Sequence, residues 1–230
     1  MTRDIPSKWL YLSSLEEAEH VQRELAERII LTDEFSFSHL IGGMDVSNNL
    51  YDPMIYASAV VLNKQNLQLE EEAATVQSQL FPYIPGFLGF RESPALVAAF
   101  KQLAKKPELI LVDGHGISHP RRLGIASHLG VLLDIPTIGV AKSVLVGHPA
   151  GPLGNAKGDT VPLMWKGEQI GTFLRTKVHC NPIIISTGHR ISLQSAVEVV
   201  LQCLTRYRLP EPTRQAHLAA NRYRRSLQSE

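Results

Sequence analysis

The sequence predicts a mixed α/β fold with one central sheet and helices on both of its faces. Three observations support this fold class. An amphipathic segment near the start is followed by three strand-like segments in a row, a pattern typical of an antiparallel meander. Two short, wholly apolar strands then alternate with helical segments, as in buried parallel sheets. The chain of 230 residues, 44% of them hydrophobic, is long enough to bury such a core without a metal or disulfide.

The first part of the chain is expected to supply one helix and three antiparallel strands. Residues 15–31 carry apolar side chains at helical spacing, and Ser14 precedes them as a capping residue. We expect the strands at 39–46, 55–63 and 67–77, where the residues are apolar or alternate in polarity.

A loop rich in proline, glycine and aromatic residues follows at 81–94. It leads into a predicted helix over 94–105, because Ser93 is a good cap and Pro94 suits the first helical position. The wholly apolar LILVD at 109–113 is then the first strand of the buried, parallel kind.

The rest of the chain continues with strand–helix–strand units. We expect a polar loop at 114–124, a helix to about residue 132, and strands at 136–142, 167–176 and 182–188. Two more helices are expected at 191–206, with Ser192 as its cap, and at 214–225. Residues 147–160 are rich in Gly and Pro and predict a surface loop, and the prolines of 208–214 separate the last two helices. No repeat or long linker interrupts the pattern, so we expect a single domain over residues 1–230.

Charge is divided unevenly along the chain, although the net charge is only +1. Residues 1–110 carry 9 Lys/Arg against 15 Asp/Glu, a net charge of −6, and residues 111–230 carry 14 against 7, a net charge of +7. A basic face attracts a polyanion such as nucleic acid, but solvated charge without a partner explains the division equally well. The two cysteines, the acidic N-terminal segment and the lack of a long uncharged apolar stretch predict a cytoplasmic protein.

Two acidic residues end apolar strands of the predicted sheet. Asp45 follows LIGGM and Asp113 follows LILV. Open α/β sheets place ligand sites at the carboxyl ends of strands, and two carboxylates brought close together must share a proton or a cation. Mg²⁺ or Mn²⁺ suits such an all-oxygen site. For Asp45 taken alone, the capping of a turn is the simpler interpretation.

Three further residues are candidates for the same chemistry. Glu92 is a possible third metal carboxylate, or a charge that favours a helix dipole. His119 is placed to contact a phosphate or to move a proton; a zinc pair with His115 is disfavoured, because no third soft ligand is near in sequence. Lys142 would neutralise charge on a phosphate, or simply extend into solvent.

The PYIP motif at 82–85 holds Tyr83 between two prolines. Proline fixes φ and stiffens a loop, and a rigid exposed aromatic side chain can enter a base stack as a wedge. The alternative is that Tyr83 packs onto the core.

Six segments form a more specific set: GGMDVSNN, FPYIPGFLGFRESPAL, LILVDGHGISHPRRLGIASHLG, DIPTIGVAKS, CNPIIISTGHRIS and YRLPEPTRQAH. Together they closely resemble the endonuclease V family, over about residues 9–217. The resemblance implies a ribonuclease-H-like fold, in which three antiparallel strands are followed by parallel strands and the mixed sheet is flanked by helices.

The resemblance also implies an activity. Family members use Mg²⁺, for which Mn²⁺ can substitute, and cut a strand at the second phosphodiester bond 3′ to inosine or deoxyinosine, leaving 3′-hydroxyl and 5′-phosphate ends. We therefore expect a hydrolase of DNA repair or inosine-RNA processing. Its expected partner is inosine-containing DNA or RNA rather than a membrane, and we expect a monomer.

The resemblance further assigns roles to single residues. The metal positions match Asp45, Glu92, Asp113 and His217. The positions at the scissile bond match His119 and Lys142. The wedge matches Tyr83 with Pro82, Ile84 and Pro85 of its loop, and the surroundings of the wedge and the extruded base match Arg91, Gly114 and Gly124. Many relatives have Asp where this chain has His217.

Two other classes of protein share parts of this pattern. A sugar- or acetate-kinase-like phosphotransferase also begins with a strand-end Asp, but it needs two such domains and a Gly-rich phosphate loop, whereas Val-Ser-Asn-Asn follows Asp45. A non-catalytic nucleic-acid-binding module of the same fold would not need three acidic residues converging with Lys142. Both alternatives predict no metal-dependent cleavage of inosine oligonucleotides.

Overall fold

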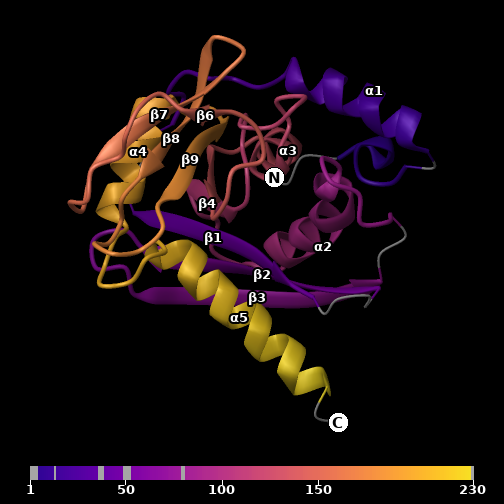
Figure 1. Cartoon of the computed structure of the whole chain (residues 1–230). Helices are drawn as coiled ribbons and strands as arrows, with labels where there is room; N and C mark the ends of the chain where they lie inside the picture. Colours follow the sequence, from indigo (N-terminus) through magenta and orange to yellow (C-terminus); the bar gives the residue numbers. More distant parts are fainter. Residues whose placement is uncertain (1–4, 13, 36–38, 49–52, 79–80, 229–230) are drawn as a thin grey trace.

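The computed structural model describes residues 5–12, 14–35, 39–48, 53–78 and 81–228. Within them, a nine-stranded mixed sheet forms the centre of the molecule (Figure 1). The strands are β1 (Leu40–Ser47), β2 (Met54–Asn63), β3 (Leu69–Ser78), β4 (Leu109–Asp113), β5 (Thr137–Ala141), β6 (His148–Pro149), β7 (Thr160–Trp165), β8 (Glu168–Leu174) and β9 (Ile183–His189). The helices are α1 (Leu15–Ala26), α2 (Leu88–Gln102), α3 (Ile125–Leu133), α4 (Leu193–Gln202) and α5 (Glu211–Gln228), and a 3₁₀ turn spans Ser7–Trp9.

The strand order is β3-β2-β1-β4-β5-β9-β8-β7-β6. Strands β1 to β3 form an antiparallel meander, and β1, β4 and β5 run parallel. This confirms the predicted mixed sheet of three antiparallel strands followed by parallel ones. The register places Met44 of β1 beside Val112 of β4, so Asp45 and Asp113, one residue further along each strand, lie side by side. Asp113 ends β4, whereas β1 continues past Asp45 to Ser47.

Each face of the sheet is covered by its own helices. Ile110 and Val112 of β4 point into a core shared with α1, α2 and α3. Leu109 and Leu111 alternate with them and point into a second core with α4 and α5. Helix α5 lies across β1 and β2 (Figure 1), which brings its His217 over the ends of the central strands. None of the helices in the described part of the chain is long and apolar enough to cross a membrane.

Two of the predicted helix caps are confirmed. The Ser14 hydroxyl accepts the backbone N–H of Glu17 at 3.1 Å, at the start of α1. The Ser192 hydroxyl accepts the backbone N–H of Ser195 at 3.2 Å, at the start of α4. Each bond satisfies an N–H that has no partner inside its helix.

The predicted start of α2 is wrong. The helix begins at Leu88, so Ser93 is not its cap and Pro94 lies inside it. Pro94 has no N–H for the Phe90 carbonyl and its ring crowds that carbonyl, but the burial of Phe90 and Pro94 in the core offsets this cost. Glu92 therefore lies on the helix rather than before it.

Other boundaries also differ from the prediction. Helix α1 ends at Ala26, five residues earlier than expected, and α5 begins at Glu211, because Pro212 is tolerated in a first turn whose N–H groups have no helical partner. Strands β6 and β7 were not predicted. The first has two residues and the second contains Pro162, which normally argues against a strand.

Candidate active site

A cavity of about 420 Å³ opens at the carboxyl ends of β1, β4 and β5. Most of the predicted site residues line it: Asp45, Tyr83, Pro85, Glu92, Asp113, Gly114, His119, Gly124, Lys142 and His217. The predicted residues Pro82, Ile84 and Arg91 do not. Residues that are distant in the sequence therefore meet in one cavity, as expected for open α/β sheets.

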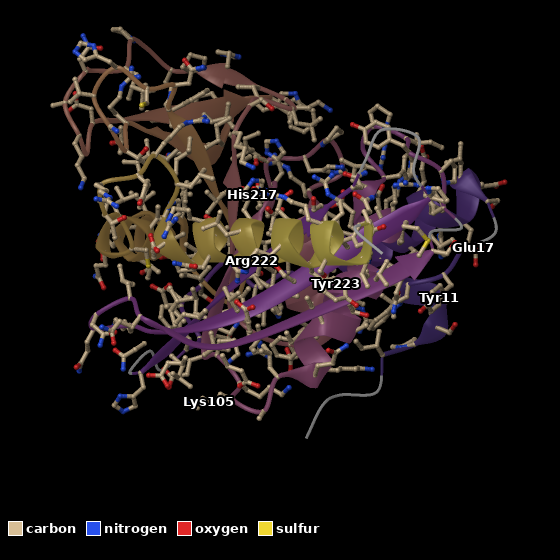
Figure 2. All side chains as sticks on the ribbon, turned by 90° about the horizontal axis from the view of Figure 1, so that it is seen from below. Tyr11, Glu17, Lys105, His217, Arg222 and Tyr223 are labelled. Atoms are coloured by element: carbon tan, nitrogen blue, oxygen red, sulfur yellow. The ribbon has the colours of Figure 1, made fainter. Side chains whose placement is uncertain are left out.

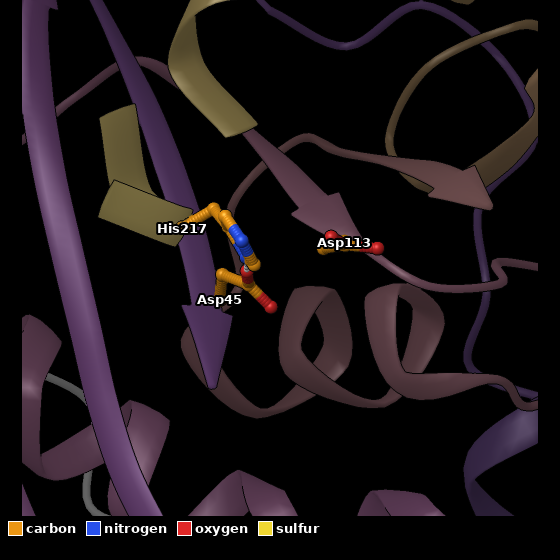
Figure 3. A group of neighbouring side chains, drawn as sticks. All are labelled: Asp45, Asp113 and His217. Atoms are coloured by element: carbon orange, nitrogen blue, oxygen red, sulfur yellow. Dashed lines mark hydrogen bonds and ion pairs between the residues drawn. The ribbon is translucent and has the colours of Figure 1, made fainter. Parts of the chain in front are cut away.

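Three side chains form a possible metal centre in this cavity. Asp45 from β1, Asp113 from β4 and His217 from α5 each offer one ligand atom, and these atoms lie within 4.8 Å of one another (Figure 3). Asp45 is buried, and His217 Nδ1 lies 2.9 Å from its Oδ2. The two carboxylates supply the oxygen ligands that suit Mg²⁺ or Mn²⁺, and the His217 ring stands beside them with its Nδ1 against Asp45, so these residues fit the expected cation.

The electrostatics of the cavity favour a cation. Burial, and after it the charge of Asp45, raises the pKa of Asp113 to about 6. Burial together with both aspartates raises the pKa of Glu92 to about 8. The hydrogen bond to Asp45 raises the pKa of His217. Burial is the larger cause for both carboxyl groups, and the smaller contribution of the neighbouring carboxylates is the part that a bound cation would offset.

Glu92 faces the cavity from α2, although it is not one of the three clustered residues. Since the helix begins at Leu88, Glu92 stands beyond its first turn, and that turn carries no acidic residue. The effect of a helix dipole fades within the first turn, so the alternative role that the sequence left open for Glu92 is weakened.

Lys142 lies just after β5, where its Nζ forms an ion pair with Asp113 Oδ2. Its positive charge is therefore directed into the cavity, in contrast to the alternative that the side chain merely extends into solvent. The pairing also lowers the pKa of Asp113, against the larger effects of burial and Asp45.

The PYIP loop stands at the mouth of the cavity. Tyr83 is 65% exposed, which excludes the alternative that it packs onto the core. Buried Phe81 and Phe87 anchor the two ends of the loop, with their ring centroids 6.3 Å apart. Arg91 is buried and donates to the Phe81 carbonyl at 2.9 Å, so it supports the base of the loop rather than facing the cavity.

Comparison with known proteins identifies the family. Residues 23–218 match the family model described as Endonuclease V. Endonuclease V of Protochlamydia amoebophila is 57% identical, over 96% of this chain and 95% of its own length. The chain belongs to the endonuclease V family. It is therefore a hydrolase of the endonuclease class.

Solved structures of endonuclease V agree with this family. The Streptomyces avermitilis protein superposes with a TM-score of 0.90 at 38% identity, covering 99% of this chain and all of its own. A variant of the Ciona intestinalis protein was solved with a 23mer DNA that contains an inosine followed by a ribo-adenosine. It has a TM-score of 0.82 at 30% identity, covering 93% of this chain and 98% of its own.

His119 lines the cavity of this endonuclease V, and both of its ring nitrogens form hydrogen bonds to backbone groups. It is buried, and its Nδ1 accepts the backbone N–H of Arg121 at 3.2 Å, so its proton sits on Nε2, which donates to the Gly86 carbonyl at 3.0 Å. Burial lowers its pKa to about 4, so the ring is neutral.

Two glycines allow the cavity wall to pack tightly. Gly114 has a φ of +147°, and a Cβ there would lie 2.3 Å from the Ile125 side chain. A Cβ on Gly124 would lie 2.3 Å from the His115 carbonyl oxygen. Any larger residue would displace backbone or core atoms, so these positions present backbone rather than side chains to the cavity.

Some residues of the site were missed by the sequence analysis. Val144 and Leu145 line the cavity and are 44% and 40% exposed, but an exposed apolar pair beside Lys142 carries no signal of its own. Ser47 and Asn221 hydrogen-bond to one another, and Asn221 reaches His217. The spacing of four residues between His217 and Asn221 was the available signal.

Proposed function

We propose that the cavity is the active site of a metal-dependent endonuclease that recognises inosine or deoxyinosine. It hydrolyses the second phosphodiester bond 3′ to that base and leaves 3′-hydroxyl and 5′-phosphate ends, in DNA repair or inosine-RNA processing. The observation that carries the proposal is the convergence of Asp45, Asp113 and His217 in one cavity whose mouth holds an exposed Tyr83. The inosine-containing DNA in the Ciona structure supports the choice of substrate.

We assign Asp45 and Asp113 to hold Mg²⁺, or Mn²⁺ in its place, with Glu92 and His217 beside them. When bound, such a cation polarises the phosphate and lowers the pKa of water. Lys142 adds a fixed positive charge next to Asp113, where the transition state gains negative charge. His217 keeps Asp45 oriented through its hydrogen bond.

We assign the recognition of inosine to the end of the cavity where Tyr83 lies. The inosine base leaves the stack, and the exposed Tyr83 ring fills the gap and stacks on the neighbouring bases. Pro82, Ile84 and Pro85 hold the loop in a shape close to the bound one, so little ordering entropy is lost on binding. His119 donates to the Gly86 carbonyl and Arg91 donates to the Phe81 carbonyl, and these hydrogen bonds fix the two ends of that loop.

We also propose a single domain, a monomer and a cytoplasmic location. One sheet runs from β3 to β6, which supports a single domain over residues 1–230. We propose that the protein acts as a monomer. The free thiols of Cys180 and Cys203 suit the reducing cytoplasm.

The test is cleavage of matched single-stranded RNA and DNA, each carrying one inosine, in Mg²⁺ and in Mn²⁺. The expected 5′ fragment ends at the nucleotide that follows inosine and bears a 3′-hydroxyl. The same strands with adenosine in place of inosine are the substrate control, and Asp113→Asn is the enzyme control. Equal cleavage of the adenosine strands would refute the substrate, and binding without any cleavage would favour the non-catalytic module.

A further inference from the structure

The side chain of Asn221 joins three groups behind the metal centre. Its Oδ1 accepts from the Ser47 hydroxyl at 2.9 Å and from the Arg224 guanidinium at 3.3 Å. Its Nδ2 lies 3.1 Å from His217 Nε2 and 2.9 Å from the His217 carbonyl oxygen. Asn221 and His217 are four residues apart on α5 and so share a face of the helix.

The direction of these hydrogen bonds follows from Arg224. A guanidinium carries only N–H donors, so the Asn221 atom that meets it must be the amide oxygen. Arg224 is itself held by a hydrogen bond to the Asn48 carbonyl at 3.1 Å. The amide nitrogen of Asn221 therefore faces His217 and donates to Nε2.

This donation selects one tautomer of His217. A neutral imidazole whose Nε2 accepts a hydrogen bond carries its proton on Nδ1. That Nδ1 lies 2.9 Å from Asp45 Oδ2, so the ring donates to the carboxylate. The other oxygen of Asp45 accepts the backbone N–H of Val46 at 2.7 Å. Both oxygens of Asp45 are thus held by donors.

We propose that Asn221 is a positioning residue: it fixes His217 as the Nδ1–H tautomer, so that His217 orients the Asp45 carboxylate toward the divalent cation. The inference rests on the proposed metal centre. Partners that fix the tautomer and orientation of groups around a metal commonly change its affinity by about 10–100-fold when they are removed.

The direct test is ¹⁵N spectroscopy of the His217 imidazole in the metal-free protein, about two pH units above the ordinary histidine pKa of ~6.5. We expect the proton on Nδ1 in the wild type. In Asn221→Asp, an acceptor of the same shape replaces the donor, so we expect a proton on Nε2. A wild-type ring protonated on Nε2 alone, or an Asn221→Asp ring unchanged from the wild type, would overturn the proposal.

The second readout is Mn²⁺ affinity by titration calorimetry. We expect Asn221→Asp to bind Mn²⁺ ~10-fold more weakly or worse. The matched control is Arg222→Gln on the same helix (Figure 2), which breaks only the exposed ion pair with Glu72 and should leave both readouts unchanged. Equal or tighter Mn²⁺ binding by Asn221→Asp would contradict the positioning role.

A separate variant distinguishes this inference from the metal centre itself. Asp113→Asn should lose Mn²⁺ binding whatever the tautomer of His217. If Asp113→Asn binds Mn²⁺ like the wild type, the metal centre is wrong, and the positioning role is lost with it. If Asp113→Asn loses Mn²⁺ while Asn221→Asp keeps the wild-type spectrum and affinity, only the positioning role is wrong.

Discussion

The two ends of the cavity are held in place in different ways. At the metal end, Asp45 and Asp113 lie on neighbouring parallel strands, whose register is set by backbone hydrogen bonds and by burial on both faces. At the recognition end, Tyr83 stands on an exposed loop whose position depends on side-chain donors. The chemistry is thus built on the sheet, and the recognition on a small number of side-chain contacts.

The contacts of the recognition end converge on two carbonyl groups. Arg91 donates to the carbonyl of Phe81, before the PYIP motif. After it, the carbonyl of Gly86 accepts from Gln22 at 2.8 Å and from His119 and Arg121 at 3.0 Å each. A loop held in this way can present an aromatic side chain rigidly while most of its own surface stays in solvent.

The largest effect is expected at the metal end. Asp113→Asn keeps the shape of the side chain but removes the charge that holds the cation. Because a metal ion contributes several kcal/mol to such a transition state, and each ~1.4 kcal/mol is a factor of ten, we expect cleavage to fall by on the order of a thousandfold or more. Inosine binding in Ca²⁺ should be largely retained, and substantial cleavage in Mg²⁺ would remove Asp113 from the metal centre.

The same variant should also change the stability of the metal-free protein. The charged form of Asp113 is disfavoured in the fold, as its raised pKa of about 6 indicates. A neutral Asn relieves that cost. The metal-free Asp113→Asn protein should therefore melt at a higher temperature than the wild type, whereas a lower melting temperature would show that the Lys142 ion pair outweighs the repulsion from Asp45.

Acid should weaken the packing of α2, because a buried, neutral histidine supports it. His128 hydrogen-bonds the Trp9 carbonyl at 2.9 Å and packs on Phe90 of α2, and burial lowers its pKa to about 4. This value lies below the ordinary ~6.5, so its contribution to stability is fully present above pH ~6.5 and is lost as the pH falls toward about 4.

The measurement for this effect is the free energy of unfolding between about pH 7 and pH 4. Two and a half pKa units correspond to about 3 kcal/mol for His128. His128→Asn should reduce the slope of the unfolding free energy against pH by the equivalent of about one bound proton. The control is His20→Gln, at an exposed position of α1. A slope that is unchanged in His128→Asn would contradict the assignment.

A smaller effect is expected at the recognition end. Stacking of a base on an aromatic ring contributes roughly 1–3 kcal/mol, so Tyr83→Ala should weaken inosine binding by about tenfold to a hundredfold and slow cleavage. Tyr83→Phe keeps the ring and should lose little. Because Tyr83 is 65% exposed, neither variant should change the melting temperature appreciably. Lost stability with unchanged affinity would refute the wedge.

The sequence was most informative where a residue's role depends on the backbone of a buried strand. An apolar run that ends in an acid predicts a strand and its exposed carboxyl end, and this was enough to pair Asp45 with Asp113. It was least informative for α2. Pro94 and Ser93 form a good helix start locally, but burial of the preceding turn extends the helix to Leu88.

Side-chain direction was also beyond the reach of the sequence. Arg91 lies next to Glu92, yet Arg91 is directed to the Phe81 carbonyl and Glu92 to the cavity. His119 lies in a motif dense in polar residues, but its Nε2 hydrogen-bonds to the carbonyl of Gly86, which is 33 residues away in the sequence. Such long-range hydrogen bonds leave no periodic pattern, and only the folded chain reveals them.

The central claim is that Asp45 and Asp113 hold a divalent cation in the cavity beside Tyr83. The most direct measurement is anomalous diffraction from crystals of the wild-type protein soaked in Mn²⁺, with Asp113→Asn crystals as the control. We expect one anomalous peak in contact with Asp45 and Asp113 that is absent from the control. A peak elsewhere on the protein, or the same peak in the Asp113→Asn crystals, would contradict it.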